Sequence, residues 1–302
     1  MDKPSGKGII FVLSAYLLWG FLPPFWKILI AVNSLHILSC RIIFSLIIVA
    51  VVLFTRKSFS WLAFYKDPHK ALLLAIAAFT VTFNWGLYIW CVNTGHTLQA
   101  SLGYYINPLF SIMFGQIFFR EKLSFLQWVA FCLAIAGVVT QTVISGSLPW
   151  VSIGMALSFS IYGLLKKKIS MPALESLGIE CLIVTPIAML LLFAPFVSVL
   201  LPTWQSVGYM ADLPAITFFF LVLSGAITMV PLYLFGRGAQ LVPLSTLGFF
   251  QFISPTMNFL FAFFVFGEPF PWYNYIVFGL IWSAMILYII SLNIATRERT
   301  DQ

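Results

Sequence analysis

Three ionisable side chains stand inside or at the edge of long apolar runs of this 302-residue chain: Lys27, Arg41 and Glu180. Charge inside a membrane-crossing helix is costly, so each of them is a functional candidate. Arg41 or Lys27 would hold an anionic or polar group of a substrate. Glu180 is the candidate proton carrier, because apolar surroundings favour the neutral form of a carboxyl group.

Each of these residues also has a structural interpretation. Arg41 would tie helices together through backbone carbonyls, Lys27 would extend to the lipid headgroups, and Glu180 would make a polar contact between helices. The sequence leaves both interpretations open.

Two prolines, Pro108 and Pro255, predict helix breaks in the middle of apolar runs. A proline there leaves the carbonyl four residues earlier without its helical partner, and such backbone is tolerated beside a wet cavity. A polar stripe accompanies each proline on one helix face. The stripes are Tyr104, Asn107, Ser111 and Gly115 in one run, and Gln251, Ser254, Asn258 and Ala262 in the other. They predict either a cavity lining or close helix packing through small and polar residues.

Further polar and aromatic side chains within apolar runs are candidates for the same lining. They are Trp19, Asn84, Tyr88, Tyr162 and Tyr233. Together with Tyr104, Asn107, Gln251 and Asn258, they predict a site for a small amphipathic organic solute.

Other chemistries find little support in the sequence. All four aspartates and all three histidines lie in loops, tails or near run boundaries, and no HExxH motif occurs. The four cysteines are far apart and form no C-x-x-C or Cys/His cluster. There is also no Gly-rich phosphate loop. We therefore expect no enzyme, no metal site, no cofactor and no ATP-driven transport.

The elements that carry these residues are predicted to be transmembrane helices. The chain is 61% hydrophobic and 8% charged, against about 25% charged residues in soluble domains. One crossing needs about 20 apolar residues. Ten apolar runs occur, at 8–31, 35–55, 71–92, 98–119, 124–144, 149–166, 174–200, 214–236, 243–266 and 272–292. The sequence predicts an all-α polytopic protein of ten transmembrane helices in the lipid bilayer.

The basic residues predict the orientation of these helices. With the N-terminus inside, the inner segments hold fourteen Lys and Arg residues, Lys166 among them, and the outer loops hold none. Basic residues near helix ends favour the cytoplasmic side. The net charge of +7 is therefore an orientation signal rather than a nucleic-acid footprint, and no nucleic-acid partner is expected. Both termini should be cytoplasmic.

The two halves of the chain resemble each other. Ala100–Tyr105 matches Ser245–Phe250, and Pro108 precedes Glu121 by the same thirteen positions that separate Pro255 from Glu268. Five crossings in each half would make the second copy enter the membrane from the opposite side. This predicts two inverted five-helix repeats, 8–144 and 149–292, followed by a cytoplasmic tail, 293–302. Inverted repeats are used by many secondary transporters. Glu121 and Glu268 are predicted to cap the starts of the fifth and tenth helices or to act as gate charges.

These motifs resemble the EamA-type repeats of the drug/metabolite transporter superfamily. The stretch Trp19–Lys27 and the segment 86–103 resemble its RarD group of chloramphenicol-sensitivity proteins most. The resemblance implies ten helices, an inner-membrane location and export or exchange of a substrate. The second repeat departs from the pattern, with Ser170 at the position equivalent to Lys27 and Glu180 at the position equivalent to Arg41.

The residues and the resemblance together predict a secondary active transporter with alternating access, a small-molecule substrate and proton coupling. The alternative is a channel or facilitator for small polar solutes. Channel filters typically use rings of carbonyls or charges, and no charge ring is evident. A monomer and a homodimer are both compatible with the sequence.

The orientation model makes a direct prediction. A fluorescent protein fused after Gln302 should be bright and alkaline phosphatase at the same site inactive, because the C-terminus is expected in the cytoplasm. The reverse pattern in whole cells would contradict the model.

Overall fold

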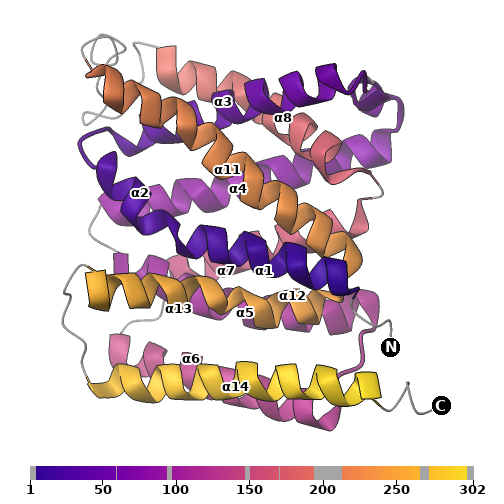
Figure 1. Ribbon diagram of the computed structural model, residues 1–302, viewed down its shortest axis with the longest axis vertical. Helices are drawn as coiled ribbons and strands as arrows, with labels where there is room; N and C mark the ends of the chain where they lie inside the picture. Colours follow the sequence, from indigo (N-terminus) through magenta and orange to yellow (C-terminus); the bar gives the residue numbers. More distant parts are fainter. Residues whose placement is uncertain are drawn as a thin grey trace.

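The computed structural model describes residues 5–58, 60–93, 97–146, 150–169, 171–193, 213–265 and 272–297, and their regular structure is all helical (Figure 1). His96, Ser170 and Glu268 lie outside the described residues. The first half contains α1 (Gly6–Gly20), α2 (Leu22–Ile28), α3 (Ser34–Thr55), a 3-10 turn η1 (Ser60–Lys66), α4 (Pro68–Asn93), α5 (Thr97–Phe119) and α6 (Phe125–Ser145). The second half contains α7 (Trp150–Lys168), α8 (Ala173–Phe193), α11 (Ala215–Leu241), α12 (Leu244–Gln251), α13 (Ile253–Leu260), a π-helical turn η2 (Phe261–Val265) and α14 (Trp272–Arg297).

Eight helical segments of the described chain are long and apolar enough to cross a bilayer. They are Gly6–Ile28, Leu35–Thr55, Pro68–Tyr88, Phe125–Ile144, Ala173–Leu192, Ala215–Leu241, Leu244–Val265 and Trp272–Ile294. The protein is therefore a multi-pass membrane protein. The remaining two of the ten predicted crossings correspond to α5 and α7, in which polar residues such as Asn107, Ser111 and Ser160 are frequent.

The helices are stacked along the longest axis of the molecule (Figure 1). α6 and α14 pack together at one end, and α5, α7 and α12 lie next to them. α3, α8 and α11 gather toward the other end, and α1 and α4 lie between. The packed pairs include α1 with α11, α4 with α7, α3 with α11, and α4 with α8.

Two of the apolar runs are interrupted helices. The first run is divided at Phe21 into α1 and α2, because Pro23 and Pro24 fit the first turn of a new helix but not the interior of an old one. The ninth run is divided at Phe252, three residues before Pro255. In contrast, α5 continues through Pro108 as one helix. The predicted break at Pro108 therefore does not occur, whereas the ninth run is interrupted close to Pro255.

Glycines allow several helices to approach backbone to backbone. A Cβ built at Gly225 of α11 would lie 2.5 Å from the Cβ of Phe44 and 2.8 Å from the backbone nitrogen of Ser45 on α3. A Cβ at Gly248 of α12 would lie 2.8 Å from the carbonyl oxygen of Pro108 on α5. The Ser45 hydroxyl also donates a hydrogen bond to the Gly225 carbonyl, at 2.9 Å. These contacts fix α11 against α3 and α12 against α5.

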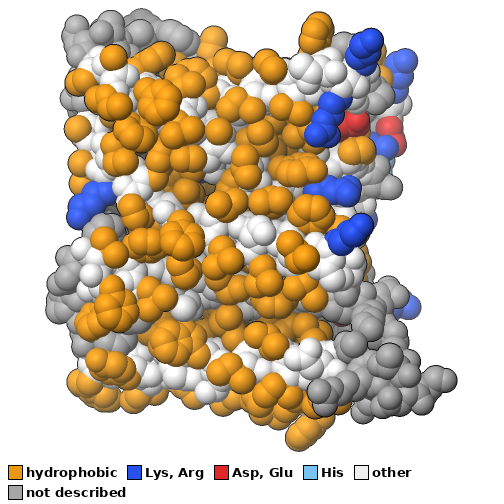
Figure 2. Space-filling view, in the orientation of Figure 1, with side chains coloured by type: hydrophobic (Ala, Val, Ile, Leu, Met, Phe, Trp, Pro, Cys, Tyr) orange, Lys and Arg blue, Asp and Glu red, His pale blue; other side chains and the backbone are white. Residues whose placement is uncertain are grey.

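The outer surface fits a lipid environment. Apolar side chains cover most of the face shown in Figure 2, and most Lys and Arg side chains gather along one edge. Phe54, Phe79 and Phe118 are 50–69% exposed, a cost in water that disappears in lipid. The edge rich in basic residues is the one where α1 begins and α14 ends (Figures 1 and 2).

The close approach of α11 to α3 predicts the effect of adding one methyl group. Replacing a helical glycine by alanine normally favours the helix by about 1 kcal/mol, and Gly279→Ala should show this gain because no atom lies within 4 Å of its Cβ position. Gly225→Ala should instead destabilise the fold, because overpacking against backbone costs about 1–3 kcal/mol. Thermal unfolding of the two purified variants in detergent checks this order, and equal unfolding midpoints would contradict it.

Candidate functional site

Lys166 and Glu180 form an ion pair inside the helix bundle. Lys166 Nζ lies 2.7 Å from Glu180 Oε1, and the two residues are only 1% and 2% exposed. Lys166 belongs to α7 and Glu180 to α8. Each charge is enclosed in protein and balanced by the other.

Two hydroxyl groups complete this cluster. Ser176 donates to Glu180 Oε1 at 2.7 Å and accepts from Lys166 Nζ at 2.8 Å, while the Tyr162 hydroxyl donates to Glu180 Oε2 at 3.0 Å. Tyr162 and Lys166 are four residues apart on α7, as are Ser176 and Glu180 on α8, so each pair lies on one helix face. Both carboxylate oxygens are thus satisfied, as a buried charge requires.

Aromatic side chains pack on one side of the Lys166–Glu180 cluster. Tyr162 stacks on Phe235 of α11 with ring centres 5.8 Å apart and ring planes 9° apart. Trp19 of α1 lies 5.6 Å from the same Phe235 ring. The backbone of α11 is also close, since a Cβ at Gly236 would lie 3.0 Å from Lys166 Cε. Trp19 and Tyr162, both predicted as lining residues, therefore contact the same Phe235 ring.

Arg41 forms a second charged centre, of different character. Its guanidinium carbon lies 4.8 Å from the ring centres of both Trp26 and Trp85. Its Nε donates to Thr228 Oγ1 at 2.8 Å. Among the described residues, no carboxylate lies within ion-pair distance of Arg41. This cation is compensated by aromatic rings and one hydroxyl, with no opposite charge beside it.

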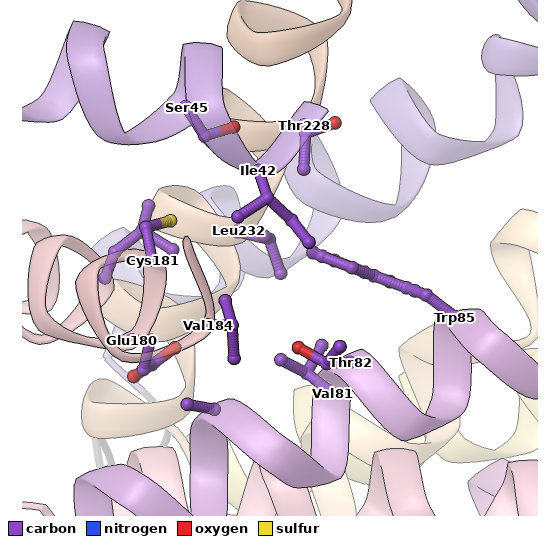
Figure 3. A pocket seen from close by; sticks show the side chains of 12 residues that line it. Ile42, Ser45, Val81, Thr82, Trp85, Glu180, Cys181, Val184, Thr228 and Leu232 are labelled. Atoms are coloured by element: carbon purple, nitrogen blue, oxygen red, sulfur yellow. The ribbon is translucent and has the colours of Figure 1, made fainter. Parts of the chain in front are cut away.

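A cavity lies between the two centres (Figure 3). Its volume is about 20 Å³, room for about one water molecule, and its lining comes from α3, α4, α8 and α11. Glu180 and Thr228 lie at opposite ends of it, and Trp85 extends along one side (Figure 3). The Thr82 hydroxyl, also in the lining, is buried without a hydrogen-bond partner among the described residues. The cavity therefore joins the Glu180 cluster to the Thr228 hydroxyl that holds Arg41.

The polar stripe around Pro108 lies mainly in a helix contact. Asn107 Oδ1 accepts from Ser160 of α7 at 2.6 Å, and Ser111 lies 3.3 Å from the same Ser160 hydroxyl. Ser111 also donates to Gln251 Oε1 of α12 at 3.1 Å. Asn107 is 4% exposed. This stripe connects α5 to α7 and α12, as expected for packing through small and polar residues.

The equivalent stripe in the second half faces α1. The Ser254 hydroxyl donates to the Tyr16 carbonyl at 2.9 Å, and Gln251 is 5% exposed. Asn258 is partly buried, and its Oδ1 has no hydrogen-bond partner among the described residues. The structure therefore separates Asn107 and Gln251, which lie in helix contacts, from the cavity between α3, α4, α8 and α11.

The remaining predicted residues lie in several places. The Asn84 amide on α4 donates to the Met155 carbonyl at 2.7 Å and to Ser158 at 3.1 Å, which ties α4 to α7. Tyr88 and Tyr104 lie with ring centres 6.1 Å apart and within electrostatic range of Arg41. Tyr233 is partly buried against the main core, and Lys27 is exposed on α2.

Glu121 connects the two halves of the chain at the edge of the bundle that carries most Lys and Arg side chains. Its carboxylate accepts from the backbone nitrogens of Leu244 and Ser245 at 2.6 and 2.8 Å, and from the Ser245 hydroxyl at 2.7 Å. Lys167 Nζ lies 4.0 Å from it. Glu121 thus caps α12, whereas α6 is capped by Ser124 in a capping box with Gln127. The prediction that Glu121 caps the fifth predicted helix, 124–144, was wrong, because the N-cap residue of the corresponding helix α6 is Ser124.

The predicted location of Lys166 was wrong. This residue was assigned to a cytoplasmic segment together with Lys167 and Lys168, but it is a buried member of α7. Its spacing of four from Tyr162 was the available signal, since that spacing turns both side chains to one face. Trp26, which contacts Arg41, was also not identified as a site residue.

Comparison with known proteins agrees with this membrane fold. The sequence profile of the EamA-like transporter family matches residues 6–142. An uncharacterized transporter of Vibrio cholerae is 41% identical over 292 residues, covering 95% of this chain and 93% of its own. Protein RarD of Escherichia coli is 38% identical over 301 residues and covers 99% of both chains. A solved crystal structure with 14% identity matches 95% of this chain and 98% of its own with a TM-score of 0.73, a likeness of fold alone. The chain belongs to the EamA-like transporter family and, within it, to the group of the RarD proteins.

Proposed function

We propose that this protein is a secondary active transporter of a small amphipathic solute, working as an exporter or exchanger in the cytoplasmic membrane. The observation that carries the proposal is the buried Lys166–Glu180 pair beside a cavity in the helix bundle. Buried ionisable groups in membrane proteins mark substrate and proton pathways. Relatives of similar length that are described as transporters support the same function.

Helix packing supports two inverted repeats. If the first repeat consists of α1 and α3–α6 and the second of α7, α8, α11, α12–α13 and α14, exchanging the repeats maps packed pairs onto packed pairs. The pair α1–α11 becomes α7–α4, and α3–α11 becomes α8–α4. The pairs α3–α8, α5–α12 and α6–α14 each map onto themselves. Such a two-fold relation allows the two halves to rock about the central site.

Proton coupling would act through the balance of charge in the cluster. In the structure, Lys166 Nζ lies 2.7 Å from the Glu180 carboxylate, and two hydroxyls donate to it. A proton on Glu180 would leave the Lys166 ammonium buried without a counter-charge, an arrangement that costs several kcal/mol. Protonation is therefore compatible with an open state in which water reaches Lys166. This links the proton to the change of conformation.

The Glu121 contacts are suited to a cytoplasmic gate. Glu121 belongs to the first repeat, whereas Leu244, Ser245 and Lys167 belong to the second. Opening this end would break three hydrogen bonds to a carboxylate, each a charge-assisted bond of the stronger kind. The gate would close when the carboxylate returns to the start of α12, where the helix dipole favours a negative charge.

Removing the charge of Glu180 should uncouple transport from protons. In Glu180→Gln, Lys166 stays buried without a counter-charge, so we expect a loss of stability of about 3–5 kcal/mol and no transport driven by a pH gradient. In the double variant Glu180→Gln with Lys166→Met, both charges are absent, so stability should largely return while coupling stays lost. Thermal unfolding and proteoliposome uptake of a solute identified by thermal-shift screening measure the two effects.

Two outcomes separate a proton carrier from a structural pair. Coupled transport by the double variant would remove Glu180 from the mechanism. Ser176→Ala serves as a matched control, because it deletes one hydrogen bond to Glu180 and keeps both charges. It should remain coupled.

Weakening the Glu121 contacts should open the cytoplasmic end more often. Cys181 lines the cavity and is buried, so its reaction with a maleimide reports access in a background without the other three cysteines. Glu121→Gln should speed this reaction in inside-out vesicles by about tenfold, since losing a hydrogen bond to a charged group costs about 1.5–3 kcal/mol.

The neighbouring Lys122→Gln is the control for a change of charge in the same loop. It should leave the Cys181 labelling rate unchanged, because Lys122 is exposed. If Glu121→Gln and Lys122→Gln both labelled at the wild-type rate, Glu121 would be a helix cap without a gating role.

A further inference from the structure

Arg41 lies in a box of four aromatic side chains contributed by three helices. Trp26 of α2 and Trp85 of α4 are the closest, each with its ring centre 4.8 Å from the guanidinium carbon. Tyr88 lies one turn after Trp85 on α4 and packs against Tyr104 of α5, with ring centres 6.1 Å apart. We name these five residues the Arg41 box. Tyr88 is 37% exposed, and Arg41 is partly buried.

The contacts of Arg41 use only part of its hydrogen-bonding capacity. A guanidinium group carries five N–H donors in one plane. The Nε donor is taken by Thr228 at 2.8 Å, and indole rings stack on a guanidinium without consuming its in-plane donors. No described residue accepts a hydrogen bond from the two terminal nitrogens. Within the described part of the chain, the terminal edge of the guanidinium therefore has no hydrogen-bond acceptor.

That free edge has the geometry of a carboxylate site. Two parallel N–H groups at the end of an arginine match the two oxygens of a carboxylate. Elsewhere in the described bundle the buried cation Lys166 has its own carboxylate, Glu180, at 2.7 Å, whereas Arg41 has none. An anion entering the box would supply the charge that the protein does not provide.

We propose that the Arg41 box binds an organic carboxylate that carries a flat apolar group. The carboxylate accepts from the terminal nitrogens of Arg41, and the apolar group packs against Trp85, Tyr88 and Tyr104. The substrate of the proposed transporter is accordingly a small organic anion. This inference rests on the proposed function only for the step from binding to transport, and the binding site itself can be tested alone.

The test compares matched pairs of ligands that differ in charge alone. The purified full-length protein is titrated with phenylacetate and phenylacetamide, with indole-3-acetate and indole-3-acetamide, and with hexanoate and hexanamide, and thermal unfolding reports binding. We expect at least one carboxylate to bind about tenfold or more tightly than its amide, because the hydrogen bonds to Arg41 are charge-assisted. Equal or stronger stabilisation by the amides in all three pairs would overturn the proposal.

Substitutions in the Arg41 box test where the carboxylate group of the ligand binds. Arg41→Lys keeps the charge but loses the fork of parallel N–H groups, and Arg41→Gln loses both, so the preference for the carboxylate should be reduced in the first and disappear in the second. Lys122→Gln removes an exposed cation and should keep the preference. If the Arg41 variants do not fold, Tyr104→Leu should still weaken the two aromatic carboxylates while leaving hexanoate less affected. A preference that survives in both Arg41 variants would overturn the assignment.

Uptake into proteoliposomes separates this proposal from the proposed function. A carboxylate that binds through Arg41 but is not transported under any ion gradient would leave the Arg41 box intact and contradict the transport function. Gradient-driven uptake of a neutral solute, with no carboxylate preference in binding, would keep the transport function and overturn the anion proposal.

Discussion

The fold depends on how a few charges are compensated inside an apolar helix bundle. An isolated ion in such surroundings costs far more than any single packing contact can return. The chain solves this in two ways. Lys166 and Glu180 compensate each other at 2.7 Å with hydroxyls on both sides, whereas Arg41 is compensated by two indole rings and Thr228. The charges of Lys166 and Glu180 cancel within the protein, whereas the positive charge of Arg41 leaves a place for an anion.

Both solutions require helices to approach closely, and small residues make that approach feasible. Gly225 brings α11 against the backbone of α3, which sets Thr228, one turn later, within 2.8 Å of Arg41. Gly236 brings the same helix against the Lys166 side chain. Replacing a buried ion pair by apolar residues is often neutral or stabilising, so stability alone does not explain why Lys166 and Glu180 occur. Under the proposed function, proton coupling would account for the pair.

Much of the fold could be predicted from the sequence, because apolar runs and proline positions report helices directly. The runs at 35–55 and 124–144 correspond to α3 and α6 within one residue at each end. The site was less predictable, because the pairing of charges depends on tertiary contacts. Lys166 stands beside two lysines and so has the composition of a loop, and only its four-residue spacing from Tyr162 indicates burial. The polar stripes were ambiguous for a physical reason: small and polar residues suit a cavity lining and a close helix contact equally well, and only the hydrogen bonds of Asn107 and Ser111 distinguish the two.

One helix contacts both charged centres and provides a physical route between them. α11 holds Arg41 through Thr228 and, two turns further on, stacks Phe235 on Tyr162 of the Glu180 cluster. Pro231 lies between these positions inside the helix and removes one backbone hydrogen bond there, which makes bending easier. An anion bound to the terminal nitrogens of Arg41 would shift the guanidinium and so change the restraint that it places on Thr228 in one half of α11, and the proline would let the other half respond at Tyr162. Because Glu180 accepts a hydrogen bond from Tyr162, a movement of that ring would change how well the carboxylate charge is stabilised. Under the proposed function, substrate binding and proton release would therefore be coupled through a single proline-containing helix, without direct contact between the two ligands.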